Sequence, residues 1–204
     1  MTWLYREEFD AAARVAADAM EEVRLSIRDG SLIHEPEMNG AFASHLASAF
    51  RKERIGGITW SCRHLRAAGA DAEESLVGAD IVIAIDISLP GFSQSKGLLI
   101  QNKRDGTSDK QKLLQQIGKM ETYTTSSWVG ILSSRQIRFD SSKTVKARRG
   151  SYSRDQARIP PFTFFRDFFQ CEIGDESLPP NRAEGIFREA DAVGIEAVLL
   201  KASK

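Results

Sequence analysis

The chain has 204 residues, of which 42% are hydrophobic and 27% are charged, as in a single globular domain with a sizeable core. Its formal net charge is zero, so overall charge neither indicates nor excludes nucleic acid as a partner. No apolar run approaches the ~20 residues that span a bilayer, and the first residues lack the pattern of a signal peptide. We therefore expect no membrane association and a cytoplasmic location. The two cysteines form no CxxC pair, which excludes a disulfide framework and a zinc site.

The charges are unevenly distributed along the chain. Residues 1–37 hold nine acids and four bases, whereas residues 101–158 hold thirteen bases and five acids. A basic region inside a neutral chain is typical of a phosphate-binding surface. The alternative is a solvated face that the acidic ends of the chain balance.

Apolar periodicity and turn signals predict a mixed α/β chain. In chain order, we expect helices over 4–28 and 37–53, a short strand at 58–60, strands at 79–87 and 97–104, a helix at 109–125, strands at 128–132 and 136–139, and a last amphipathic helix at 183–201. The polar, basic residues 140–158 should form a loop, and the aromatic residues of 160–169 must be buried. The predicted architecture is one domain, 1–204, in which a mixed sheet flanked by helices occupies about 35–140 and helical additions occupy 1–30 and 160–204.

The predicted hairpin, ADIVIAIDI followed by LPGFSQSK and GLLIQNKR, brings three polar side chains together. Gln101 and Lys103 are two residues apart on one strand, so both point to the same face. A turn centred near Gly91 and Phe92 would pair positions whose numbers sum to about 183. Asp80 then lies opposite Lys103, with Gln101 as a diagonal neighbour. The alternative is that Asp80 and Lys103 form a simple cross-strand ion pair.

GAD, an apolar strand, a turn and LLIQNKR together resemble the PD-(D/E)XK nuclease superfamily. The match is to the variant of Mrr-like restriction endonucleases, in which Gln replaces the acidic residue before x-Lys. The resemblance covers roughly residues 35–132 and implies a restriction-endonuclease-like fold. An earlier helix supplies a Glu in that superfamily. Here the helix begins EPEMNGAFASHL, in which Glu37 fits that role and Glu35 is the nearby rival.

The resemblance implies a nuclease that depends on Mg²⁺, with Mn²⁺ as a substitute. It would hydrolyse phosphodiester bonds in DNA as an endonuclease in restriction or phage defence. Asp80, Gln101 and Glu37 would hold the metal through oxygen atoms, which Mg²⁺ prefers. Lys103 would orient the attacking water or stabilise the developing negative charge. Glu73 and Glu74 precede GAD closely and are further candidates to approach the metal.

The helix after the third strand often carries a QxxxY-like element in this superfamily. KLLQQIGKM provides Gln116, with Met120 in the place of the aromatic residue. We expect Gln116, Lys119, Arg104 and Lys110 to contact DNA.

A second hypothesis is a catalytically inactive nuclease-fold module that binds nucleic acid or a protein partner. Gln101 motivates it, because a neutral amide stands where the superfamily usually has a carboxylate. In either case, a homo-oligomer or a regulatory protein partner is an expected means of control.

Overall fold

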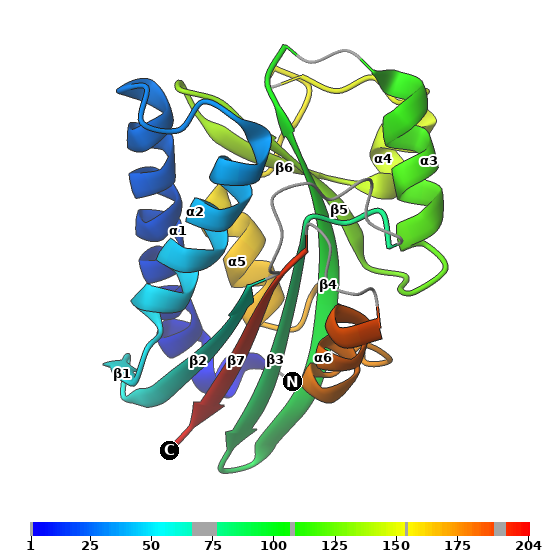
Figure 1. Ribbon diagram of the computed structural model, residues 1–204. Coiled ribbons are helices and arrows are strands. Elements are labelled where there is room, and N and C mark those ends of the chain that lie inside the picture. Colours follow the sequence, from blue (N-terminus) through cyan, green and yellow to red (C-terminus); the bar gives the residue numbers. More distant parts are fainter. Residues whose placement is uncertain (1, 67–76, 107–108, 154, 190–194) are drawn as a thin grey trace.

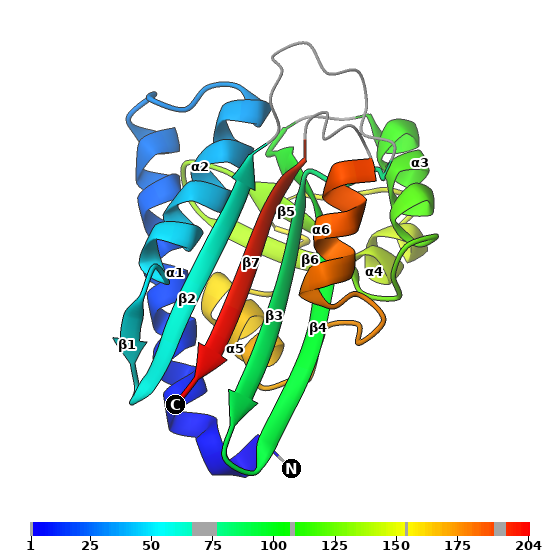
Figure 2. The ribbon, with the colours of Figure 1, turned by 60° about the horizontal axis from the view of Figure 1, so that its bottom comes forward.

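The computed structural model describes residues 2–66, 77–106, 109–153, 155–189 and 195–204. The strands are β1 (Glu53–Ile55), β2 (Ile58–Arg66), β3 (Ile81–Leu89), β4 (Phe92–Arg104), β5 (Ser127–Leu132), β6 (Ile137–Ser141) and β7 (Glu196–Ser203). A 3-10 helix at Thr2–Tyr5 precedes the α-helices, which are α1 (Arg6–Arg28), α2 (Glu35–Ala49), α3 (Lys110–Met120), α4 (Ser142–Ala147), α5 (Pro161–Phe169) and α6 (Pro180–Glu189). The strands form one seven-stranded mixed sheet in the order β1-β2-β7-β3-β4-β5-β6 (Figures 1 and 2).

The sheet separates two apolar cores. Helices α1, α2 and α5 cover one face, and α3, α4 and α6 cover the other (Figures 1 and 2). Strand β3 contributes to both cores, since Ile81 and Ile83 face the first while Val82 and Ala84 face the second. A strand that helices cover on both faces has no solvent side, which explains why this segment is a continuous apolar run.

The predicted hairpin forms, but its turn is tighter than expected. β3 and β4 pair from Leu89 opposite Phe92 to Ile81 opposite Ile100, so paired numbers sum to 181 instead of about 183. The turn consists of Pro90 and Gly91, and the φ of Gly91 is 73°, a value that residues with a β-carbon rarely adopt. Residues expected in a long turn therefore extend both strands.

The predicted helix at 183–201 is wrong in its second half. Helix α6 ends at Glu189, and β7 lies in the middle of the sheet, antiparallel to β2 and parallel to β3. Val198 and Leu200 pack into the core under α1, α2 and α5, whereas Ala197 and Leu199 pack into the other core. This alternation has a period of two residues, so the predicted helical stripe combined side chains from opposite faces. The C-terminal segment is thus part of the sheet and not a helical addition.

Three smaller expectations also change. Residues 142–147 of the predicted loop form α4, and the Ser141 side chain caps it by accepting a hydrogen bond from the Thr144 amide. Helix α2 begins two residues before its predicted start, and β2 extends to Arg66 instead of ending at 60. The predicted burial of the aromatic segment is confirmed, since α5 buries four phenylalanines, Phe164, Phe165, Phe168 and Phe169. Among the described helices, none is both long enough and apolar enough to cross a membrane.

Candidate active site

Asp80 lies immediately before β3, at the end of the sheet where β3 begins and β4 ends. Its amide donates a hydrogen bond to the Ile100 carbonyl at 2.9 Å, and its carbonyl accepts one from the Glu196 amide at 2.8 Å. Strands β4 and β7 therefore fix the Asp80 backbone from both sides. With the observed register, Asp80 stands opposite Gln101 and not, as expected, opposite Lys103.

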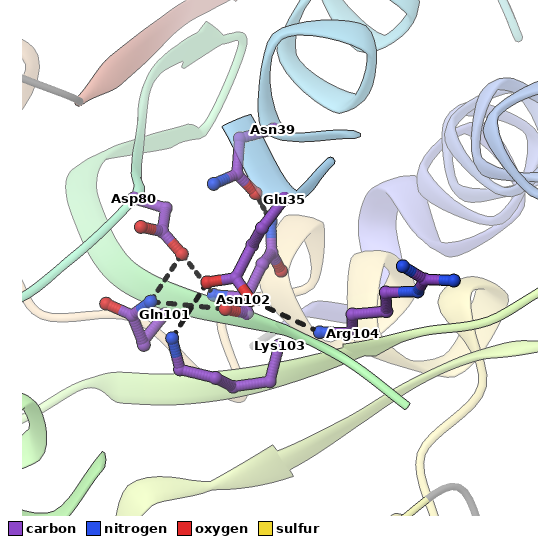
Figure 3. Close-up of polar contacts among 7 residues, drawn as sticks. All are labelled: Glu35, Asn39, Asp80, Gln101, Asn102, Lys103 and Arg104. Carbon is purple, nitrogen blue, oxygen red and sulfur yellow. Dashed lines mark hydrogen bonds and ion pairs between the residues drawn. The ribbon is translucent and has the colours of Figure 1, made fainter. Parts of the chain in front are cut away.

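One carboxylate oxygen of Asp80 collects two hydrogen bonds from β4. Asp80 Oδ2 accepts from Gln101 Nε2 at 2.6 Å and from the Asn102 amide at 2.7 Å (Figure 3). Gln101 is only 1% exposed, and its Nε2 also donates to the Asn102 carbonyl at 3.1 Å. Gln101, which was expected to be a diagonal neighbour of Asp80, is therefore in direct contact with it.

Glu35, at the start of α2, is the acidic residue that reaches Lys103. Lys103 Nζ lies 2.8 Å from Glu35 Oε1, and the Arg104 amide donates to Glu35 Oε2 at 3.4 Å (Figure 3). Lys103 is 9% exposed, so this ion pair is largely withdrawn from water. Glu35 thus ties the first turn of α2 to the end of β4, on which the QxK motif lies.

Glu37 does not occupy the position expected of it. Its Oε2 accepts hydrogen bonds from the amides of Ile33 and His34, both at 3.1 Å, as part of a capping box at the start of α2. These bonds hold the pKa of the Glu37 carboxyl below its ordinary value. Because α2 begins at Glu35, Glu37 falls three residues after the N-cap, which is the position from which a Glu caps a helix. Had the helix start been placed at Glu35, that spacing would have assigned Glu37 to the cap and Glu35 to the site.

Asn102 and Asn39 form a buried contact that sequence reasoning missed. Asn102 points to the α2 face, and its Nδ2 donates to Asn39 Oδ1 at 2.9 Å (Figure 3). Gly130 on β5 makes room for this side chain, because a β-carbon there would stand 2.1 Å from Asn102 Oδ1. The contact fixes β4 against α2 between the Asp80 and Lys103 interactions.

Burial dominates the electrostatics of Asp80. The pKa of its carboxyl is raised from 3.8 to about 7, chiefly because burial removes the group from water, and the negative charge of Glu35 contributes to this rise. The positive charge of Lys103 and the hydrogen bonds from Asn102 and Gln101 lower this pKa but only partly offset burial. The ionised form of Asp80 is thus short of positive charge in this environment, which a bound cation would supply.

The oxygen atoms around Asp80 fit a hard divalent cation. Within the described part of the chain, no three His, Cys, Asp or Glu side chains gather closely enough to hold a metal. Asp80 and Glu35 supply carboxylates, and the remaining protein donors are the Gln101 amide oxygen and the Asn102 carbonyl. A half-turn of the Gln101 amide would present Oε1 where Nε2 now lies. Mg²⁺ commonly binds one or two carboxylates and keeps several waters, so this set suits it. The candidates Glu73 and Glu74 lie outside the described residues.

The expected DNA-contacting residues lie in different environments. Arg104 and Lys110 are exposed, and Lys119 is half-buried. The Arg104 guanidinium donates to the Ile33 carbonyl at 3.2 Å, at the rim of the site. Gln116 lies on the buried face of α3, which does not fit a direct contact with DNA.

A second buried carboxylate, Glu196, stands at the same end of the sheet. Glu196 Oε2 lies 2.6 Å from His64 Nε2, and its Oε1 lies 3.7 Å from Arg66 Nε. These residues come from β7 and β2, whose pairing joins segments more than a hundred residues apart in the sequence. No local pattern marks them, so sequence reasoning did not find this cluster.

Comparisons with models of protein families, with curated protein sequences and with solved structures found no match to this chain. The order and direction of the strands thus define the fold, and the side-chain geometry described above is the basis for a functional assignment.

Proposed function

We propose that this chain is a metal-dependent nuclease that hydrolyses phosphodiester bonds in DNA. We further propose that its core is restriction-endonuclease-like and that it acts as an endonuclease in restriction or phage defence. The observation that carries the proposal is the convergence of Asp80, Gln101, Lys103 and Glu35 at one end of the β3–β4 hairpin. A helix supplies a Glu, an Asp precedes one strand, and a QxK motif ends its partner. This is the order of elements that the resemblance to the PD-(D/E)XK superfamily implies.

Asp80 and Gln101 would hold Mg²⁺ or Mn²⁺, with Glu35 in the role expected of Glu37. The bound cation would acidify the attacking water and neutralise charge on the phosphate. Since the pKa of Asp80 is about 7, this carboxyl must give up its proton when the cation binds. We therefore expect Mg²⁺ affinity to rise between about pH 6 and pH 8.

Lys103 supplies the positive charge that phosphoryl chemistry needs beside the carboxylates. Its ammonium is held by Glu35 at 2.8 Å, so it is oriented before any substrate arrives. From this position it would donate to a phosphate oxygen or orient the attacking water. Arg104 at the rim, with Lys110 beyond it, would bind neighbouring backbone phosphates.

The test is cleavage of duplex and single-stranded DNA by the purified protein with Mg²⁺ or Mn²⁺ at pH 8. We expect Asp80→Ala to abolish cleavage. Asp86→Ala is the matched control, because Asp86 is an exposed acid on the same strand, bonded to Ser95 near the turn. Cleavage that survives both Asp80→Ala and Lys103→Ala would show that this cluster is not the active centre.

A second candidate function is an inactive nuclease-fold module that binds DNA or a protein partner. The observation that favours it is the neutral amide of Gln101, which leaves two carboxylates at the site. Calorimetric titration with Mg²⁺ distinguishes the two candidates. DNA binding without measurable metal binding would favour the inactive module, whereas metal binding that Asp80→Ala removes would favour the nuclease.

A further inference from the structure

Four adjacent strands each carry a charged residue at the end of the sheet that contains Asp80, and we call this staggered set the row of charges. Arg66 pairs with Glu196 and Glu196 pairs with Ile81, so Asp80 lies one residue beyond that level and Lys103 lies three residues beyond Ile100. Arg66 ends β2, Glu196 begins β7, Asp80 precedes β3, and Lys103 lies at the end of β4. Cations therefore stand at both ends of the row and carboxylates stand between them. Neighbouring strands are about 4.8 Å apart, so the strand of Arg66 lies roughly 10 Å from that of Asp80.

Buried groups anchor the Arg66 end of this row. Glu196 is buried, and it forms a short contact with His64 and a 3.7 Å ion pair with the Nε of Arg66. The amide of the same Glu196 donates to the carbonyl of Asp80 at 2.8 Å. The residue that holds the Arg66 guanidinium is thus bonded directly to the backbone of the principal candidate for metal binding.

The Arg66 guanidinium is nevertheless open to a ligand. Its side chain is 75% exposed, although its partner Glu196 is buried. Gly40 on α2 faces it, and a β-carbon on Gly40 would stand 3.8 Å from Arg66 Nη2 and 3.7 Å from Glu196 Oε1. Because residue 40 is glycine, α2 projects no side chain over this group.

We propose that Arg66 binds a backbone phosphate of the nucleic acid next to the phosphate that would be cut at Asp80. This inference rests on the proposed function and specifies its substrate class. The substrate would be a polynucleotide that extends about two strand spacings from Asp80, roughly 10 Å, and not a small phosphodiester. A guanidinium matches phosphate oxygens in pairs, and its carboxylate partner keeps it oriented. The alternative is that Arg66 and Glu196 form only a surface ion pair, in which case removal of Arg66 would leave DNA binding unchanged.

Arg63 provides a matched control for this role. It lies on the same strand with a side chain 63% exposed, and it pairs with Glu184 at 2.5 Å. Glu184 belongs to α6, so Arg63 projects from the opposite face of the sheet to the face that α2 covers. Arg63→Ala therefore removes one exposed, paired arginine without touching the row of charges.

The first experiment measures DNA affinity against salt concentration for the wild type, Arg66→Ala and Arg63→Ala, with EDTA and again with Ca²⁺. Loss of one phosphate contact should reduce the slope of log K against log salt by about 0.9 for duplex DNA. We expect this reduction, with several-fold weaker binding, for Arg66→Ala alone. Equal slopes for the three proteins, or no DNA binding by the wild type under either condition, would overturn the inference. A wild type that binds DNA with this Arg66 dependence but never cuts it would refute the nuclease and leave the phosphate site standing.

The second experiment compares hydrolysis of DNA with hydrolysis of bis(p-nitrophenyl) phosphate, a diester with a single phosphate and so with no neighbouring phosphate for Arg66 to bind. We expect Arg66→Ala to lose at least about fivefold in the rate on dilute DNA and to keep the wild-type rate on the small diester. Equal losses on both substrates would assign Arg66 to the chemistry or to the fold and contradict the proposal. Thermal denaturation of each variant shows whether its fold is intact.

Discussion

Strand β4 carries two buried lysines with opposite surroundings. Lys96 is 2% exposed and lies near the turn, whereas Lys103 is 9% exposed and lies at the other end of the strand. Their sequence contexts, SKG and NKR, do not distinguish them. Their partners do: those of Lys96 belong to the packing of the fold, and those of Lys103 belong to the candidate site.

The hydrogen-bond acceptors of Lys96 are neutral carbonyls, although Glu172 and Glu176 are close enough to raise its pKa. Its Nζ donates to the carbonyls of Phe168 and Ile173 and lies 4.8 Å from the centre of the Phe168 ring. Burial lowers the pKa of this ammonium. The Phe168 carbonyl lies in the last turn of α5, where the helix dipole favours a cation, and Ile173 lies just after the helix. The role of Lys96 is therefore to hold α5 against the sheet.

Lys103, by contrast, stands among carboxylates. Glu35 pairs with it directly, and its charge lowers the pKa of Asp80 against the effect of burial. The carboxylates that act on Lys96, those of Glu172 and Glu176, are exposed. A buried lysine thus points to a candidate functional site when nearby carboxylates are also buried and lack enough positive charge to compensate them.

The largest expected effect separates the two lysines by activity. Lys103→Met should reduce DNA cleavage by roughly 10²–10³-fold, as loss of one oriented donor to a developing charge typically does. Lys96→Met should leave the rate per folded molecule within about twofold of the wild type. Single-turnover cleavage at saturating enzyme measures both. Equal losses from the two substitutions would remove the functional distinction between the lysines.

The second largest expected effect distinguishes Lys96 from Lys103 by how much each contributes to the stability of the fold. Lys96→Met should lower the free energy of unfolding by about 2 kcal/mol, because two carbonyls lose their donor in a buried environment. Lys103→Met should cost less, since the side chain of Glu35 is 29% exposed and water can solvate it. Urea denaturation at pH 7 gives both values. The comparison fails if Lys103→Met proves the more destabilising of the two.

The raised pKa of Asp80 predicts how the stability of the protein depends on pH. Between about pH 4 and pH 7, the folded metal-free protein keeps a proton on Asp80 that the unfolded chain has released, so wild-type stability falls as pH rises through this window. Asp80→Asn removes this dependence, and an Asn oxygen can accept the bonds that Oδ2 now accepts from Gln101 and Asn102. We expect Asp80→Asn to be more stable than the wild type by about 1–2 kcal/mol at pH 8 and by little at pH 4. Chemical denaturation at both values tests this, and an advantage that did not grow with pH would contradict the raised pKa.

The smallest effect concerns the two acids at the start of α2. Glu37→Gln should lower stability by about 0.5–1 kcal/mol through a weaker cap and leave metal affinity unchanged. Glu35→Gln should weaken Mg²⁺ binding and free Lys103. Calorimetry and thermal denaturation on the pair separate the roles. Weaker metal binding in Glu37→Gln would restore the original assignment of Glu37.

Local sequence was sufficient to predict the β3–β4 hairpin and the polar residues that it brings together. The apolar run of β3 and the spacing of Gln101 and Lys103 depend on neighbours along the chain, where periodicity is informative. The error in the turn centre shifted the register by two residues and so kept every side chain on its predicted face. This parity is why Asp80 and Gln101 were correctly expected on the same face despite the wrong register.

Long-range pairing accounts for what the sequence did not predict. EAVLL in β7 contains Glu, Ala and Leu, which favour helices, and only its position between β2 and β3 makes it a strand. The cluster of Glu196, His64 and Arg66 depends on the same pairing. The exchange of Glu37 for Glu35 has a different origin, because it follows from where α2 begins, and element boundaries are poorly fixed by periodicity.

The position of β7 between β2 and β3 also determines when the sheet can form completely during folding. β2 has no neighbour toward β3 until residues 196–203 have been synthesised, so the sheet stays divided while most of the chain emerges. Contacts between such distant segments make folding slow and leave strand edges exposed in the meantime. The pairing of β7 with β3 also brings the Glu196 amide to the Asp80 carbonyl. The candidate centre would therefore be assembled late in folding, after the hairpin that carries most of its side chains.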